Sequence, residues 1–411
     1  MKIYINLRSD FYKLGSFLIA LSLILNCGSI WSTVGNSSIF LFSTLIIGII
    51  LCFFSIKPND IYFSKQNLFF ISFFSIYLLI YILQPQNILN LKDGIEYFVS
   101  FFSLLFYVII FERKENILLS IKYYINIMAI IGCISLLFWT FGSLFKVISP
   151  TGSIISYWST ENGTPCPSYY GIYFETQSLN NIIRNTAIFT EAPMASLNFV
   201  IAFLFQDLFN KGDRSHNIKE IILILCILST ISTTGYIALI LIFVLKMLLM
   251  SYRNKNILLP VGVVVGIILI FLVHFLLSLK INDGSGQTRV DDFRAGLQAW
   301  KLHPFMGSGL NSSVYRQFMA NWRSYNLGFS NTIMDVLSSG GIYIFILYFI
   351  SVIVSLFKSL KDNNISNIIF IILISYLFIT TIFSNTYILF LVFILISVNS
   401  SIYRKRIETL L

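Results

Sequence analysis

Residues 220–250 read EIILILCILSTISTTGYIALILIFVLKMLLM, an almost continuous apolar run that is too long for a single membrane crossing. A small polar cluster, STISTTG at residues 229–235, interrupts the run near its middle. Small hydroxyl residues followed by glycine favour a turn. The run therefore predicts two membrane-spanning helices, at 220–232 and 234–250, joined by a tight turn at the edge of the bilayer.

Apolar runs recur along the whole chain of 411 residues, of which 56% are hydrophobic and only 11% are charged. An ordinary soluble domain carries roughly 25% charged residues, so the sequence indicates a polytopic helical membrane protein. We expect an all-α fold with one membrane domain, residues 1–411, of about twelve transmembrane helices. Besides the pair above, spans are expected at 14–32, 38–56, 67–83, 94–111, 125–146, 192–209, 257–279, 336–357, 366–383 and 385–401.

The basic residues indicate which side of the membrane each loop occupies. The short segment Glu112-Arg113-Lys114 is basic, whereas the turn from Thr33 to Ser37 has no charge. Because short cytoplasmic loops carry an excess of Lys and Arg, both termini are expected in the cytoplasm. The net charge of +10 is then explained by membrane topology and does not indicate a nucleic-acid partner.

Two long exterior loops follow from this topology, at residues 147–191 and 280–335. Loops of such length inside a compact protein are usually either functional or disordered. The first is rich in aromatic residues, which suit the apolar faces of sugars, although a belt at the membrane interface is an equally common use. It ends with RNTAIFTEAP at residues 184–193, directly before the span at 192–209.

The second loop contains TRVDDFRAGLQAWKLHPFMGSGLN at residues 288–311. Thr288 and Asp291 predict the capped start of a helix, Pro304 predicts its end, and Gly307-Ser308-Gly309 allows a close approach of the backbone. One apolar helix face is expected from spacings of three and four, with Val290, Phe293, Leu297 and Trp300. A helix that simply lies in the membrane interface, anchored by its tryptophan, is the alternative interpretation.

Arginine dominates the basic residues of the two exterior loops. The positive-inside rule works against cations on this side, so their presence indicates a function. The guanidinium group binds phosphate oxygens through a rigid fork of donors. We expect an anionic ligand at Arg184, Arg289 and Arg294, and simple solvation at Arg316 and Arg323.

Exterior carboxylates are candidates for a general base. Glu191 is the best placed, at the mouth of a span where apolar surroundings raise a carboxyl pKa. An ion pair with Arg184 or a place at a helix start would also explain it; Asp291, Asp292 and Asp335 are further candidates. No His, Cys or acidic residues have metal-site spacing, so we expect no metal and no cofactor.

RNTAIFTEAP, STTGYIALIL and the 288–311 segment, taken together with the pattern of spans, resemble the O-antigen polymerase and O-antigen ligase superfamily. The resemblance implies a glycosyltransferase-C-like membrane fold in the bacterial inner (plasma) membrane, multi-pass. It also implies transfer of an oligosaccharide from undecaprenyl diphosphate to an acceptor on the periplasmic face, without metal, ATP or nucleotide sugar. Carried over onto this chain, it implies catalytic roles for Arg289 and Glu191. Substrate contacts are expected at Arg184, Arg294, His303, Gly307 and Gly309.

One departure bears on the two branches of this superfamily. The ligase branch carries a histidine shortly before a glycine-rich entry into the next span, and here Ser330 stands in its place, before Gly340-Gly341. We therefore expect a polymerase that uses lipid-linked oligosaccharide as both donor and acceptor, with the lipid bilayer and a chain-length regulator as further partners. A ligase acting on lipid A core and a transporter of lipid-linked sugars remain open, although transporters usually place ionisable residues deep in their spans.

Overall fold

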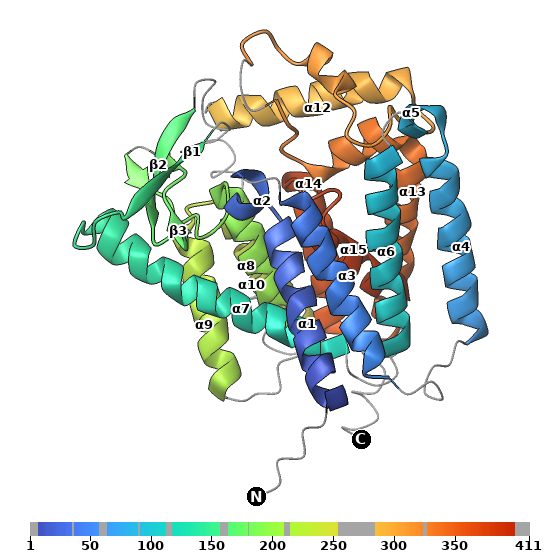
Figure 1. Cartoon of the computed structure of the whole chain (residues 1–411), viewed down its shortest axis with the longest axis horizontal. Coiled ribbons are helices and arrows are strands. Elements are labelled where there is room, and N and C mark those ends of the chain that lie inside the picture. Colours follow the sequence, from blue (N-terminus) through green and yellow to red (C-terminus); the bar gives the residue numbers. More distant parts are fainter. Residues whose placement is uncertain are drawn as a thin grey trace, which may run out of the picture.

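The computed structural model describes residues 7–34, 37–56, 64–88, 91–111, 117–156, 163–179, 181–208, 214–253, 284–323 and 327–398. The described chain is a bundle of helices with a small β region on one side and one helix lying across one end (Figure 1). That crossing helix is α12, and we call this end of the bundle the α12 end. The span expected at 257–279 lies outside the described residues.

The first part of the chain supplies one half of the bundle. Its helices are α1 (Leu7–Asn26), α2 (Ile30–Val34), α3 (Ser38–Phe54), α4 (Lys65–Ile82), α5 (Pro85–Ile88), α6 (Leu91–Phe111) and α7 (Ile117–Phe138), which continues into a π-helical turn, η3 (Trp139–Leu144). Helix α1 packs chiefly against α3 and α7, and α6 packs against α3, α4 and α15.

The second part supplies the central helices and the crossing helix. It contains α8 (Ala192–Leu208), α9 (Arg214–Ser229), α10 (Thr233–Arg253), α12 (Gly284–Leu302), a 3₁₀ turn η4 (Val314–Phe318), α13 (Thr332–Lys361), α14 (Ile365–Thr380) and α15 (Tyr387–Val398). Helices α8 and α15 are buried on nearly every side. A helix that is apolar all round is stable only when other helices surround it, so these two lie at the centre.

The membrane character agrees with the sequence in part. Three described helices are long and apolar enough to cross a membrane, at Leu91–Phe111, Leu119–Leu144 and Thr332–Lys361, and shorter apolar helices accompany them. The run at 220–250 forms two helices, α9 and α10, with a turn between Ser229 and Thr233, as its polar cluster predicted. The number of twelve spans stays a prediction.

The all-α expectation is wrong for the first long loop. Residues 147–191 contain a three-stranded antiparallel sheet of β1 (Gly152–Ser156), β2 (Thr164–Tyr169) and β3 (Tyr173–Phe174), and a two-stranded hairpin of β4 (Ser178–Leu179) and β5 (Ile182–Ile183). Its aromatic residues form a core: the buried Tyr169 and Tyr173 pack against Phe138. Aromatic side chains favour such a half-buried pleated surface.

Helix α13 is broken, and the 304–309 segment fills the break. Gly341 has φ 60° and ψ −163° inside the helix. Beyond the break, the Ile342 and Tyr343 N–H groups donate to the carbonyls of Pro304 and Phe305. Before the break, the carbonyls of Ser338 and Ser339 accept from Ser308 and Gly309. The backbone groups that the kink frees are therefore satisfied by this one segment.

The buried face of α12 differs from the predicted one. Val290 is 65% exposed and Leu297 is 42% exposed, whereas Asp291 and Asp292 are buried, together with Ala295 and Ala299. The predicted cap at Thr288 is also wrong, because α12 begins at Gly284. The polar face is turned inward because its carboxylates accept hydrogen bonds from backbone N–H groups of the loop after η4. The N–H of Ala320 donates to Asp291, and that of Ser330 donates to Asp292.

Candidate functional site

Arg184 ends the first long loop and is held by two separate parts of the chain. Its Nε donates to the Thr230 carbonyl at 3.0 Å, and its Nη1 donates to Gln177 Oε1 at 3.2 Å. The same Gln177 oxygen accepts from the Ala192 N–H at 3.0 Å, which is the first residue of α8. Gln177 thus fixes the guanidinium relative to the start of α8.

Arg289 approaches the same region from α12. Its Nη2 donates to Thr234 Oγ1 at 3.3 Å, and Thr234 lies in the first turn of α10. The α9–α10 turn therefore carries a partner for each arginine, Thr230 for Arg184 and Thr234 for Arg289. Both guanidinium groups are partly buried, in a place where fixed charge acts strongly because water is scarce.

Glu191 completes the group from the position before α8. Its carbonyl accepts from the Met194 and Ala195 N–H groups, so its backbone opens the helix. Its carboxylate makes no hydrogen bond or ion pair to any described residue, but it lies close enough to Arg184 and Arg289 to interact with both electrostatically. We call Arg184, Arg289 and Glu191 the arginine–glutamate site.

Burial and the attraction between opposite charges shift the pKa values of this site in opposite directions. Burial lowers the pKa of Arg184 to about 10, and Glu191 acts in the opposite direction. The pKa of Arg289 is also lowered by burial. Burial raises the pKa of Glu191, and the two arginines counteract that rise. The arginines remain charged at neutral pH, while the carboxyl group becomes a better proton acceptor.

The arrangement can bind a polyanion beside a base. Two guanidinium groups from different elements lie close enough to interact electrostatically, and such a pair of cations suits the oxygens of a diphosphate. The neighbouring carboxylate has unused acceptor capacity for a hydroxyl proton. Because each arginine is held by backbone or buried hydroxyl groups, little reorganisation is needed when charge develops on a ligand.

Arg294 is not part of this group. It pairs with Asp291 at 2.8 Å and donates to the Phe318 carbonyl, with a side chain that is 55% exposed. Helical geometry explains this, since residues 289 and 294 are five apart and do not share a face. A role for Arg294 in substrate binding stays a prediction that these contacts do not support.

The remaining predicted contacts lie near the break in α13. His303 is exposed just beyond α12. Gly307 and Gly309 both have positive φ, and a Cβ at Gly307 would lie 2.3 Å from the Ser339 backbone. The close approach that the two glycines were expected to allow is thus made to the protein itself. Their roles as substrate contacts stay predictions.

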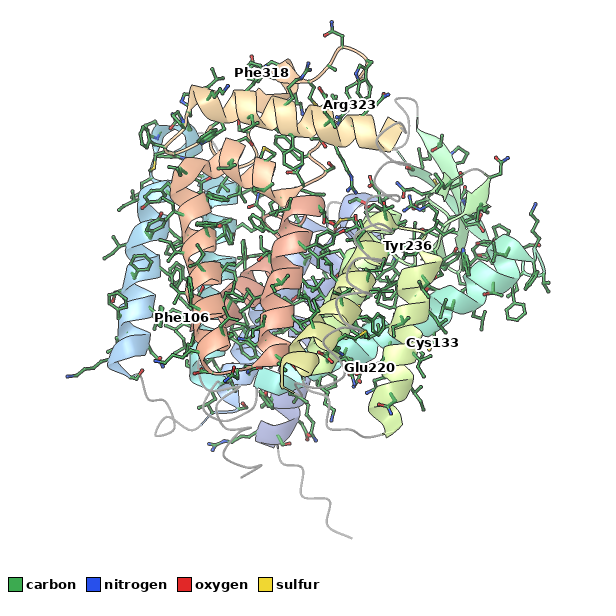
Figure 2. The ribbon with its side chains drawn as sticks, turned by 180° about the vertical axis from the view of Figure 1, so that it is seen from behind. Phe106, Cys133, Glu220, Tyr236, Phe318 and Arg323 are labelled. Atoms are coloured by element: carbon green, nitrogen blue, oxygen red, sulfur yellow. The ribbon has the colours of Figure 1, made fainter. Side chains whose placement is uncertain are left out.

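Arg323 was expected to be solvated, and this is wrong. Its side chain is 3% exposed and pairs with Asp292 at 2.9 Å. Figure 2 shows Arg323 at the α12 end of the bundle. Arg316 is exposed, as expected. The carboxylates of Asp291 and Asp292 therefore hold loop backbone and Arg323, while the Asp335 carboxylate accepts from Ser384. Among the proposed bases, Glu191 alone lies beside both Arg184 and Arg289.

Three residues of the site were not predicted: Gln177, Thr230 and Thr234. The polar cluster at residues 229–235 signalled the turn that carries the last two, but nothing local showed that arginines would bind there. Gln177 gave no signal in the sequence. Among the residues that the structure describes, no group of His, Cys, Asp and Glu could hold a metal ion, and independence from metals stays a prediction.

A comparison with known protein families matches the part of the chain that carries Arg289 and the α9–α10 turn. Residues 221–349 match the family model described as O-Antigen ligase. This match agrees with the resemblance of the chain to the O-antigen polymerase and ligase superfamily. The segment matched to this superfamily covers less than half of the chain and carries Arg289 with the α9–α10 turn, but not Arg184 or Glu191. Together with the apolar helices, this match indicates a membrane protein. No curated protein and no solved structure matches it.

Proposed function

We propose that this protein is a membrane glycosyltransferase that joins undecaprenyl-diphosphate-linked oligosaccharide repeat units at the periplasmic face of the bacterial inner membrane. The observation that carries the proposal is the arginine–glutamate site, where Arg184 and Arg289 lie beside the free carboxylate of Glu191. In this proposal the α12 end faces the periplasm and both termini lie in the cytoplasm.

The reaction assigns a task to each residue. A hydroxyl oxygen of the acceptor sugar attacks the anomeric carbon of the donor, and the bond from that carbon to the phosphate oxygen breaks. The leaving lipid diphosphate gains negative charge, which Arg184 and Arg289 stabilise. Glu191 accepts the proton of the attacking hydroxyl, so all atoms and charges are accounted for without a metal or a nucleotide sugar.

The polymerase branch is favoured by Ser330. Its backbone N–H donates to Asp292 at 2.9 Å, so Ser330 helps to hold the following loop against α12. A serine hydroxyl is a far weaker base than an imidazole, so a ligase that depended on histidine at this position would lose that group. The same lipid-linked oligosaccharide is then both donor and acceptor.

The proposal is tested with purified protein in nanodiscs and only one substrate, the lipid-linked repeat unit. A polymerase builds a ladder of lipid-linked products that differ by one whole repeat unit. Formation of that ladder in the presence of EDTA is the expected result. Absence of any ladder at protein levels that bind the substrate would contradict the proposal.

The ligase is the second candidate, favoured by the description of the matching family model. Gene deletion separates the two. Loss of a polymerase leaves single repeat units that still reach the surface acceptor. Loss of a ligase leaves long lipid-linked polymer and no capped acceptor, and this outcome would replace the polymerase by the ligase.

A further inference from the structure

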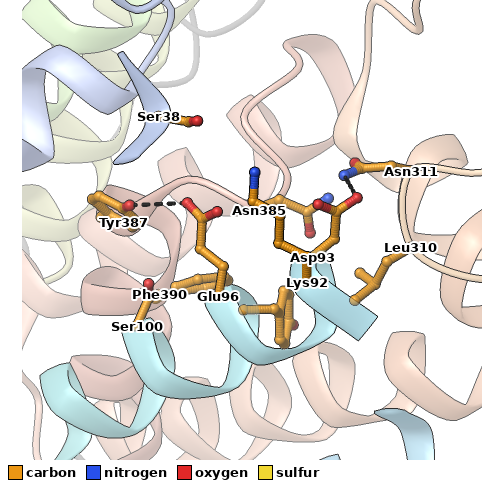
Figure 3. A pocket seen from close by; sticks show the side chains of 11 residues that line it. Ser38, Lys92, Asp93, Glu96, Ser100, Leu310, Asn311, Asn385, Tyr387 and Phe390 are labelled. Atoms are coloured by element: carbon orange, nitrogen blue, oxygen red, sulfur yellow. Dashed lines mark hydrogen bonds between the residues drawn. The ribbon is translucent and has the colours of Figure 1, made fainter. Parts of the chain in front are cut away.

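A polar cavity lies at the α12 end, outside the arginine–glutamate site. It has a volume of about 260 Å³ and lies between the first turns of α3, α6 and α15 and the segment after Gly309 (Figure 3). Pockets for drug-sized ligands typically have volumes of roughly 300–1,000 Å³. This cavity therefore suits a smaller group, about one sugar ring.

Two carboxylates from adjacent turns of α6 face this cavity. Asp93 accepts a hydrogen bond from Asn311 Nδ2 at 2.8 Å, and Glu96 accepts one from the Tyr387 hydroxyl at 3.4 Å (Figure 3). Lys92 is the one basic residue of the lining. With two carboxyl groups against one ammonium, the cavity disfavours an anionic ligand and accepts hydroxyl or amino donors.

One buried hydroxyl of the lining has unused hydrogen-bonding capacity. Ser100 lines the cavity and is fully buried, yet its Oγ has no hydrogen-bond partner of normal geometry, the Tyr387 hydroxyl being its nearby polar neighbour. Burying such a group without a partner costs free energy. The lining also includes the amide side chains of Asn311 and Asn385.

The wall of the cavity is joined to the arginine–glutamate site through the end of α1. The Tyr387 N–H donates to Asn26 Oδ1 at 2.9 Å. Two residues further along the chain, the Gly28 carbonyl accepts from the Thr190 N–H at 3.0 Å, directly before Glu191. The cavity and the catalytic candidates thus flank the same helix end at the same end of the bundle.

We propose that this cavity binds one neutral or amino-bearing sugar residue of the oligosaccharide, with Asp93 and Glu96 accepting hydrogen bonds from its hydroxyl or amino groups. This inference rests on the proposed glycosyl transfer. Carboxylates are strong acceptors for sugar hydroxyls, and the rings of Tyr97 and Phe390 add apolar surface to the same lining. The arginines bind the diphosphate, so the two sites select different parts of the substrate.

Binding of free oligosaccharide tests the site without any turnover. The probe is the repeat unit cut from its lipid diphosphate by mild acid, added to the full chain in nanodiscs. Saturation-transfer NMR is expected to show contact at one sugar residue. Glu96→Gln and Asp93→Asn are each expected to weaken the Kd about tenfold, because each substitution removes a charged acceptor. Ser100→Leu, which fills the cavity, provides an independent variant.

Arg289→Ala is the matched control. It is expected to abolish turnover and to leave the affinity for free oligosaccharide unchanged. Affinity that falls with Arg289→Ala but not with Glu96→Gln, Asp93→Asn or Ser100→Leu would place the glycan in the arginine–glutamate site and overturn the inference. Absence of binding to wild-type protein would also overturn it.

Different experimental results would contradict the inference and the proposed function. Oligosaccharide binding that depends on Glu96, in a protein that makes no ladder, would contradict the polymerase and keep the sugar site.

Discussion

Arg289 of α12 donates a hydrogen bond to the Thr234 hydroxyl at 3.3 Å, and so ties the crossing helix to the α9–α10 turn. Arg184 binds the Thr230 carbonyl of that same turn. The turn interrupts the apolar run that marks the chain as a membrane protein, and it also orients both guanidinium groups. One short polar segment thus separates two apolar helices and also positions both candidate arginines.

Replacing Arg289 is expected to reduce turnover strongly. Arg289→Ala should lower the rate of ladder formation by about 10²–10³, the range for loss of one fixed donor to developing charge. Arg289→Lys should recover little of it, because an ammonium cannot reproduce the planar fork. The rate is measured at matched protein levels. Arg316→Ala, at an exposed arginine, is the control, and an equal loss there would indicate a general charge effect.

Glu191 is expected to set the acid limb of the pH profile. Burial raises its pKa, and a base must be deprotonated to act. Activity should therefore rise with pH through a pKa above the ordinary glutamate range, and fall at lower pH where Glu191 is protonated. The measurement is kcat/KM against pH. Glu191→Gln should abolish the limb and most activity; an unchanged profile in this variant would remove Glu191 from the mechanism.

The ion pair between Arg323 and Asp292 is expected to matter for stability. Removing one partner of a buried pair costs about 3–5 kcal/mol because the other charge is left uncompensated. Arg323→Ala should therefore lower the Tm in detergent markedly. Arg294→Ala breaks the pair of a half-exposed arginine with Asp291 and should cost about 0–1 kcal/mol. Equal losses in the two variants would contradict the difference in burial.

Gly341 is expected to tolerate no side chain. A Cβ there would lie 2.4 Å from the Phe305 carbonyl oxygen, at a positive φ. Gly341→Ala should displace the 304–309 segment and reduce folded protein, measured by fluorescence-detected size exclusion. At Gly328 a Cβ would meet no atom within 4 Å, so Gly328→Ala should behave as wild type. Normal folding of Gly341→Ala would show that the break in α13 can close.

Opposite ends of the bundle are expected to lie on opposite sides of the membrane. Gln317 follows α12, and Lys361 ends α13 at the other end; both are exposed. In a background with all native cysteines replaced by serine, Gln317→Cys should react with an impermeant maleimide in spheroplasts, and Lys361→Cys should react only after lysis. The reverse pattern would invert the topology and remove the periplasmic site.

Much of the candidate site was predictable because its signals are local. A basic residue on the side expected to be exterior is unusual in a membrane protein, so Arg184 and Arg289 could be selected without a structure. Glu191 could be selected for its place at the start of a span. Their grouping at one turn was not predictable, since residue 184, the turn with residues 230 and 234, and residue 289 meet only when three separate segments pack together.

Several residues were misread because their partners are distant in sequence. Arg323 looked solvated, but a buried carboxylate on α12 pairs with it. Gly307 and Gly309 looked suited to a ligand, but the broken backbone of α13 occupies their surroundings. The inward face of α12 could not be read from apolar spacing, because its buried carboxylates serve backbone donors of the following loop.

The sequence by itself determined the class of the protein and the helix pair at 220–250, and it put Arg184, Arg289 and Glu191 among the candidate site residues, because hydropathy, turn composition and charge asymmetry act over short stretches. Tertiary structure alone decided the β region in the first loop, the contact between the 304–309 segment and α13, and the cavity of Asp93 and Glu96. These features depend on unsatisfied backbone and carboxyl groups finding partners across the fold. Such pairing is a property of packing, and no local pattern records it.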